Sequence, residues 1–175
     1  MSSLASIEGL FYLAATIAVV ASLKVVTGKN TVHALLYLVI SLLAVAVCFY
    51  LMGAPFAAGL EVIVYAGAIL VLFVFAVMMF GLGIDETQNA PQSRGLSLWI
   101  GPVFLGVLLL IELILVIGNS ELSLQLNSQI VDSKQVGMLL YGPYLLAVEI
   151  SSFLLLAGLV AGYHYAKPEP RGGRL

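Results

Sequence analysis

Five long apolar runs, separated by short polar segments, dominate the chain. They cover residues 4–26, 31–51, 57–82, 96–117 and 141–165. A helix needs about 20 apolar residues to cross roughly 30 Å of hydrocarbon, so each run is long enough to span a bilayer. The connections carry turn residues and charge, as in "TGKN", "MGAP" and "GIDETQNAPQSRG". The pattern predicts an all-α integral membrane protein with five transmembrane helices.

Composition supports a membrane protein over a soluble one. Of the 175 residues, 62% are hydrophobic and 9% are charged, whereas a soluble domain is about 25% charged. We expect a single five-helix membrane domain over residues 1–166 and a short tail over residues 167–175. No basic residue precedes the first apolar run, so we expect that run to stay as an uncleaved span rather than act as a signal peptide.

Basic residues predict the orientation. Six of the seven fall in the first connection, the third connection and the tail, which lie on one side of a five-span topology. Because positive charge accumulates on the cytoplasmic side, the N-terminus is predicted to be periplasmic and the C-terminal tail cytoplasmic. The basic residues on that side are Lys24, Lys29, Arg94, Lys167, Arg171 and Arg174, and the exception is Lys134.

The composition also excludes several classes of function. One cysteine, Cys48, rules out an intrachain disulfide, a CxxC redox pair and a cysteine-ligated iron–sulfur cluster within this chain. The net charge is −2 and no basic tract is present, so nucleic acid is not expected as a partner. No internal repeat is evident, which argues against a transporter built from inverted repeats.

Three acids, Glu61, Glu112 and Glu149, lie inside the third, fourth and fifth predicted spans, which contain no lysine or arginine to pair with them. A charge at the bilayer centre costs about 2.5–3.5 kcal/mol on insertion scales. By the predicted topology, all three lie one to two turns from the outer face. They are candidate proton-path groups, or acids satisfied by headgroups near the interface. Glu61 and Glu149 favour the first interpretation and Glu112 the second.

The middle of the third run combines polar and flexible features. Tyr65 follows Glu61 by four residues, which places both on one face of an α-helix. The small residues Ala66, Gly67 and Ala68 come next, near the predicted midplane. Small residues allow close helix approach, and Gly lowers helix stability by about 1 kcal/mol relative to Ala. Such a position tolerates a π-bulge, a feature common at functional sites.

Other candidate chemistry is sparse. His33 and His164 both fall near cytoplasmic ends of spans, where interface or hydrogen-bonding roles are favoured over haem ligation. No catalytic triad, phosphate-binding glycine loop or metal-ligand cluster is visible in the sequence. We therefore expect no catalytic centre, bound cofactor or metal in this chain.

Three stretches carry a family resemblance. They are "VVTGKNTVHALLYLVISLLAVAV", "AGLEVIVYAGAILVLFVFAVMM" and "LYGPYLLAVEISSFLLLAGLVAGYHYA". Together they resemble the J-subunit family of the bacterial proton-pumping NADH:quinone oxidoreductase, respiratory complex I, whose mitochondrial counterpart is ND subunit 6. The resemblance covers residues 20–166 and is most specific in the third span. The fourth span matches loosely, and the resemblance implies no role for Glu112.

The resemblance implies both a mechanism and a setting. In this family the third helix contains a π-bulge near the stretch that corresponds here to Tyr65, Ala66, Gly67 and Ala68. That helix is thought to rotate between bulged and regular forms, and so to gate a hydrated proton path between the quinone region and the antiporter-like subunits. Glu61, Tyr65 and Glu149 are the candidate proton-path or coupling residues.

The implied setting is the bacterial inner (plasma) membrane, within a translocase that couples electron transfer to proton translocation. The implied partners are the small membrane subunits A and K, the H-type subunit that forms part of the quinone site, and the lipid bilayer. NADH, FMN, iron–sulfur clusters and quinone would belong to other subunits. The alternatives are a small membrane transporter or channel acting alone, and a purely structural membrane scaffold. A transporter would need a substrate site at the midplane, where only the Tyr65–Ala68 region is a candidate.

Overall fold

A computed structural model describes the chain except for residues 1, 29, 80–94, 119–129 and 167–175. The described residues form helices and turns and contain no strand. Their contacts divide the chain into two units, Met1–Val131 and Asp132–Leu175, which are described separately below. The basic residues Lys29 and Arg94, the third connection and the tail lie outside the described residues, and the orientation of the termini stays a prediction.

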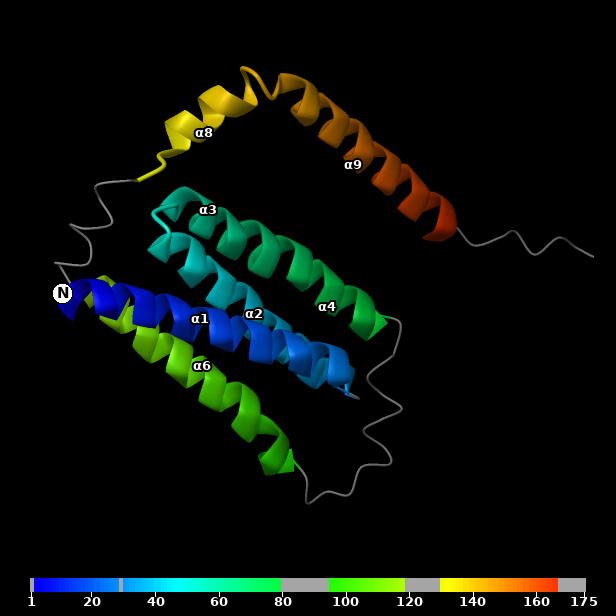
Figure 1. The fold of residues 1–175 in the computed structure, drawn as a ribbon. Helices are drawn as coiled ribbons and strands as arrows, with labels where there is room; N and C mark the ends of the chain where they lie inside the picture. The colour runs from blue at the N-terminus through cyan, green and yellow to red at the C-terminus, as the bar shows by residue number, and fades with distance from the viewer. Residues whose placement is uncertain (1, 29, 80–94, 119–129, 167–175) are drawn as a thin grey trace, which may run out of the picture. The chain divides into compact units, whose positions relative to one another are not determined.

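The first unit is built from four membrane-length segments (Figure 1). α1 (Ser2–Thr27) and α2 (Thr31–Leu51) form a helical hairpin. The third segment consists of α3 (Pro55–Leu60), the π-helical η1 (Glu61–Ile69) and α4 (Leu70–Met79). α6 (Gly95–Gly118) follows. α2 is central because it packs against α1, α6 and the third segment.

The core of this unit lies where α1, α2 and α6 meet. It contains small and branched apolar side chains that let the three helices approach closely. Leu109 and Val116 are the buried contributions from α6. The buried residues of the cluster are Ala14, Ile17, Ala21, Ile40, Ala44, Val47, Leu51, Leu109 and Val116.

The ends of α2 are fixed by local hydrogen bonds. Asn30 is its N-cap, and the Asn30 side chain accepts hydrogen bonds from the amides of Val32 (3.0 Å) and His33 (3.2 Å). After Leu51 the chain turns through Gly53, whose φ of 79° suits glycine. The Val131 amide donates to the Gly53 carbonyl at 3.0 Å. This bond places Val131 beside the α2–α3 turn.

The described part of the second unit, up to Ala166, has two helices. α8 (Ser133–Leu140) is capped by Asp132, whose carboxylate accepts a 2.8 Å hydrogen bond from the Ser133 amide. A turn then leads into α9 (Leu145–Ala166). α8 was not predicted from the sequence, because an eight-residue helix is too short to stand out as an apolar run. The fifth span was predicted to start at residue 141, whereas α9 begins at Leu145.

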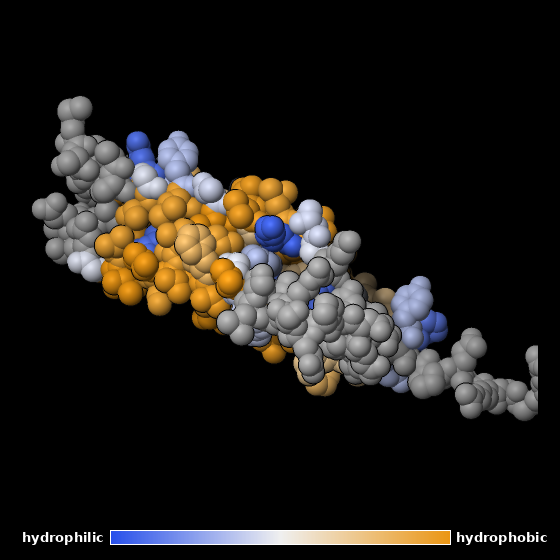
Figure 2. All heavy atoms as spheres, turned by 90° about the horizontal axis from the view of Figure 1, so that it is seen from below, coloured by the Kyte–Doolittle hydropathy of each residue, from blue (hydrophilic) through white to orange (hydrophobic). Residues whose placement is uncertain are grey.

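Five of the described helical segments are long and apolar enough to cross a membrane, as predicted. They are Ile7–Thr27, Thr31–Leu51, Pro55–Met79, Trp99–Gly118 and Leu145–Tyr165. Their outward surfaces are apolar, and Figure 2 shows hydrophobic side chains gathered over the helical surface with few polar atoms between them. Large exposed side chains such as Ile63, Leu72 and Leu155 contribute to these surfaces. A bilayer or partner helices would cover them.

Candidate functional site

The third segment packs on α2 along one stripe, and the spacing of that stripe changes at η1. Between Ala58 and Leu70, the buried and half-buried positions apart from Gly59 are Ala58, Glu61, Ala66 and Leu70. The steps are three, five and four residues, and the step of five falls inside the π-helical turns, which have more residues per turn than an α-helix. The π-helix therefore rotates α4 relative to the position that it would have in a continuous α-helix.

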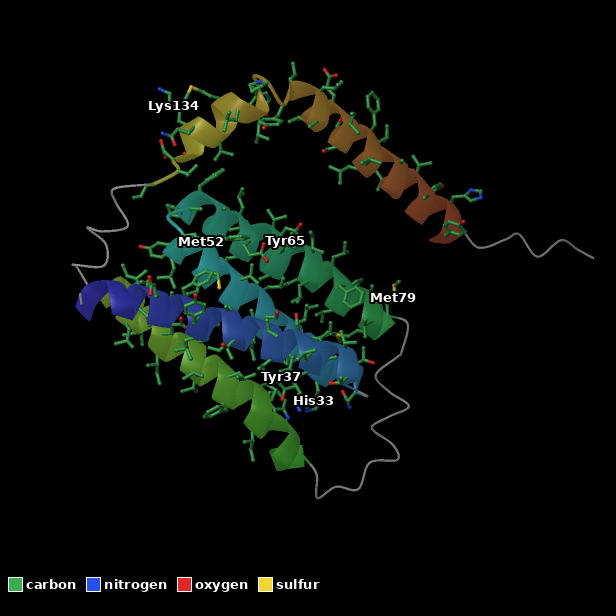
Figure 3. The ribbon with its side chains drawn as sticks, viewed as in Figure 1. His33, Tyr37, Met52, Tyr65, Met79 and Lys134 are labelled. Carbon is green, nitrogen blue, oxygen red and sulfur yellow. The ribbon has the colours of Figure 1, made fainter. Side chains whose placement is uncertain are left out.

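Glu61 and Tyr65 differ in their surroundings, although both lie in η1. The side chain of Glu61 is 8% exposed and faces the unit's interior, whereas Tyr65 is 53% exposed. The two side chains were expected to share one face, but the packed stripe passes from Glu61 to Ala66 and leaves Tyr65 exposed. Figure 3 shows Tyr65 on the third segment, between Met52 of the preceding turn and Met79 at the segment's far end. Tyr65 is thus placed to meet lipid or a partner.

Glycine at position 67 suits the π-helical turn. A Cβ atom built on Gly67 would lie 3.2 Å from the Val62 carbonyl oxygen, five residues earlier, which is a crowded contact. The same wide turn appears in the bond from the Leu70 amide to the Tyr65 carbonyl, also five residues back. In the widened turn, a side chain at position 67 would therefore crowd the Val62 carbonyl oxygen. Gly59, in the preceding α3, has open space at the corresponding point.

An apolar cavity of about 390 Å³ borders the start of η1. It lies between α2, the third segment and α6, within the first unit. Its walls include Val47 and Tyr50 of α2, Gly59 and Val62 of the third segment, and Leu113 of α6. The cavity leaves one side of the π-helical segment without close packing.

Glu149, the third predicted site residue, lies in the second unit on α9. It is exposed, and its backbone carbonyl accepts a 2.7 Å hydrogen bond from the Ser152 hydroxyl. The Ser151 hydroxyl donates to the Ala147 carbonyl at 2.8 Å. The structure brings Tyr65–Ala68 and Glu61 together in one segment, but Glu149 belongs to the other unit.

Glu112 is enclosed in the α1–α2–α6 core. Its side chain is 1% exposed, and neither carboxyl oxygen has a hydrogen-bond partner among the described residues. Contact with headgroups was the favoured interpretation of this acid in the sequence, and that expectation was wrong. The missed signal is the spacing of Leu105, Leu109, Glu112 and Val116, which places the acid on the packed face of α6.

Two further contacts join α2 and α6 near the N-terminal ends of both helices. At the beginning of α6, the His33 and Trp99 rings meet edge to face with centroids 6.2 Å apart. Gly101 leaves room for the Tyr37 hydroxyl, with which any Cβ would collide. Figure 3 shows the labelled His33 and Tyr37 together at this end of the unit. The sequence singles out His33 but does not predict these neighbours.

Ser22 and Ser41 form a hydrogen bond in the middle of the α1–α2 hairpin. Their hydroxyl oxygens are 3.2 Å apart, and the Ser41 hydroxyl also donates to the Ala18 carbonyl at 3.1 Å. Ser41 is buried. Within the described parts of the chain, no three His, Cys, Asp or Glu side chains are grouped so that they could hold a metal ion.

These features define a multi-pass, all-helical membrane protein with buried acids and a π-helical span. The family model for NADH-ubiquinone/plastoquinone oxidoreductase chain 6 matches residues 21–164. The chain therefore belongs to this family.

Relatives with the same kind of subunit name match almost the whole chain. NADH-quinone oxidoreductase subunit J of Pseudomonas aeruginosa is 50% identical over 94% of this chain and 99% of its own length. The Escherichia coli K12 subunit J is 48% identical over 94% of this chain and 89% of its own length. The subunit J of Buchnera aphidicola from Schizaphis graminum is 44% identical over 91% of this chain and 98% of its own length. The resemblance noted in the sequence is thereby confirmed.

Proposed function

We propose that the chain is the J-type membrane-arm subunit of a proton-translocating NADH:quinone oxidoreductase in the bacterial inner membrane. The family match over residues 21–164 and the relatives named subunit J support this assignment. In this proposal, flavin, iron–sulfur clusters and the quinone site belong to other subunits. The exposed apolar faces of the spans meet lipid and neighbouring membrane subunits, and the proposed neighbours are the A-, K- and H-type subunits.

We further propose that the third span gates a hydrated proton path. The observation that carries this proposal is the π-helical segment Glu61–Ile69, which lies inside a membrane-length helix. Converting its wide turns to α-helical turns would rotate the residues that follow by about 100° for each residue of register. Such a rotation would move Tyr65 and its neighbours relative to α2, so that they make or break contact with water and partner helices.

The packing of the third span favours such a change. The span contacts the rest of the unit along a single stripe, and the cavity of about 390 Å³ lies beside the start of η1. Gly67 lies where the widened turn crowds a carbonyl, so glycine lets both helix types form there. Glu61 supplies a buried carboxyl at the beginning of the segment, and Glu149 of α9 is a further candidate proton-path group.

The test is a Gly67→Val variant of the intact complex. Valine is β-branched and would crowd the Val62 carbonyl, so it disfavours the π-helical form. The complex is expected to assemble, with NADH–quinone turnover and proton pumping lowered together. Gly158→Val, in α9, is the control because a side chain there meets no atom within 4 Å and Gly158 does not border the cavity. Normal turnover and pumping in an assembled Gly67→Val complex would exclude the gating role.

A further inference from the structure

Polar side chains follow one face of α2 through most of the span. His33, Tyr37, Ser41 and Cys48 are separated by four, four and seven residues. On an α-helix these positions fall within a stripe about 80° wide, and they extend for roughly 22 Å along the helix axis. This stripe faces the α1–α6 side, as its contacts with Ser22, Trp99 and Gly101 show. It is distinct from the α2 residues Val47 and Tyr50, which border the cavity.

Glu112 extends the stripe at its far end. Gly118 ends α6 six residues after Glu112, and Leu51 ends α2 three residues after Cys48. Glu112 and Cys48 therefore lie about 9 and 5 Å from the ends of their helices. Cys48 packs against the same core cluster as Leu109 and Val116, which flank Glu112 on α6. The residues of α1 that pack on this core, such as Ala14 and Ile17, are apolar. No cation faces Glu112 from the described parts of these helices.

The unpartnered buried atoms lie at the two ends of this stripe. In the described residues, the buried side-chain atoms without a hydrogen-bond partner are Nε2 of His33 and the two carboxyl oxygens of Glu112. The Asn30 Oδ1 atom can only accept, and it lies 3.2 Å from His33 Nδ1. The neutral ring therefore carries its proton on Nδ1, and Nε2 is a buried acceptor that lacks a donor. Leaving such groups unsatisfied costs about 1–3 kcal/mol each.

Water and mobile protons resolve both deficits. A partner chain cannot reach Glu112 at 1% exposure without displacing packed helices. A water molecule held between the helices would donate to His33 Nε2 or bond to the Glu112 carboxyl. An ionised carboxylate here would have no compensating cation, whereas a carboxyl that holds a proton avoids an unpaired buried charge.

We propose that His33, Tyr37, Ser41, Cys48 and Glu112 form a proton path along α2, with Glu112 as the proton-binding group at one end. Water fills the gaps between them, the largest being about 10 Å of helix between Ser41 and Cys48. Each transfer breaks one O–H or N–H bond and forms another. A proton that enters at one end is balanced by a proton that leaves at the other. This proposal uses α1, α2 and α6 and does not depend on the π-helical segment.

The test is infrared spectroscopy of the intact complex in lipid vesicles. The wild type is expected to show the C=O stretching band of a protonated carboxyl, and this band should be replaced by a carboxylate band as the pH rises. The same band is expected to be absent from Glu112→Gln. Glu112→Asp keeps the acid and is expected to shift the band, which assigns it even if the glutamine variant fails to assemble. An unchanged acid region in both variants would overturn the proposal.

The route is tested by the rate of hydrogen–deuterium exchange at the same band. Ser41→Ala removes a hydroxyl from the stripe and is expected to slow exchange about fivefold, the effect of one lost hydrogen bond. Ser151→Ala is the matched control because its hydroxyl bonds a backbone carbonyl on exposed α9. Ala44→Ser adds a hydroxyl between Ser41 and Cys48 and is expected to speed exchange.

Equal exchange rates in Ser41→Ala and Ser151→Ala would overturn the path along α2, and a band that never exchanges would overturn proton binding at Glu112. NADH–quinone turnover of Gly67→Val is measured separately. Failure of the proposed gating role therefore leaves the exchange result intact, and failure of the α2 path leaves the gating result intact.

Discussion

The second and third spans are neighbours of similar length and hydrophobicity, but they are held in different ways. α2 is a regular α-helix with a capped N-terminus, and 39% of its most apolar window is buried. The third span contains nine π-helical residues, and the corresponding share is 11%. α2 has neighbours on several sides, whereas the third span touches the unit mainly through α2. Packing thus holds α2 more firmly than the third span, and the proposed change of helical register is placed in the more loosely packed of the two.

This difference separates two kinds of proton-path candidate. On α2, polar side chains lie at regular α-helical intervals in a packed core. Water molecules would therefore bind between helices whose positions do not change. On the third span, Glu61 and Tyr65 sit in turns whose geometry has an α-helical alternative. Changes to the third span should therefore alter activity, whereas changes to α2 should alter stability first.

The largest expected effect is that of Gly67→Val on activity. Overpacking by a branched side chain costs about 1–3 kcal/mol, so the π-helical form should lose most of its population. NADH–quinone turnover and proton pumping by the assembled complex should both fall about tenfold or more, since ~1.4 kcal/mol corresponds to a factor of ten. Gly158→Val should retain near-normal values of both, and an equal loss in the two variants would point to lost assembly contacts instead of gating.

A second prediction concerns the packing of α2 against α6. Gly101→Ala places a Cβ against the Tyr37 hydroxyl and should destabilise the subunit by about 1–3 kcal/mol. Thermal dissociation of the subunit from the complex measures this effect as a lower midpoint temperature. Tyr37→Phe removes the hydroxyl and should restore part of the loss in the double variant. If Tyr37→Phe restores nothing, the two helices are not in contact at this point.

A smaller effect is expected at the N-terminus of α2. Asn30→Ala removes the acceptor for the Val32 and His33 amides and should cost about 1 kcal/mol. The same dissociation measurement applies, and Asn30→Asp is the control that keeps the capping oxygen. Turnover at moderate temperature should be close to normal in both variants. A strong loss of turnover in Asn30→Ala alone would mean that α2, too, takes part in the switching.

The smallest predicted change is that of Glu61→Gln. Glu61 lies about 9 Å from the start of its helix, six residues after Pro55, and so nearer the predicted outer face than Gly67. Turnover should fall about two- to fivefold, the effect of ~0.5–1 kcal/mol from one weakened hydrogen bond. This loss should be milder than that of Gly67→Val. Complete inactivity in Glu61→Gln would show that position along the helix is a poor guide to the importance of this acid.

The sequence predicted the helical architecture well because long apolar runs have one physical solution in a bilayer. Five such runs stand out by length alone, and the structure has five matching segments. The short helix α8 could not be foreseen, because eight residues with lysine and glutamine lack a distinctive apolar pattern. The start of the fifth span was placed four residues early because Tyr141 was counted in the apolar run, whereas residues 141–144 form a turn before Leu145.

The candidate site was only partly predictable. Glu61, Tyr65 and Gly67 could be named because an acid, a phenol and a glycine are conspicuous in an apolar run. Their separate environments could not be, because a π-helix changes which positions face a neighbour. Burial of Glu112 depends on which side of α6 meets α1 and α2. Nearly every residue of α6 is apolar, so the spacing that marks its packed face did not stand out. The α2 stripe was hidden because its members are weakly polar and far apart in the sequence.

The most direct test of the gating proposal is a distance measurement on the third span during turnover. Spin-labelled amino acids would replace Leu72 of α4 and Tyr12 of α1, which are 70% and 68% exposed respectively. A one-residue change of helical register rotates α4 by about 100°, which displaces a label carried roughly 5 Å from the axis by about 8 Å. The account predicts a second distance population, shifted by several ångströms, during NADH oxidation. A single unchanged distance in resting and turning-over complex would contradict it.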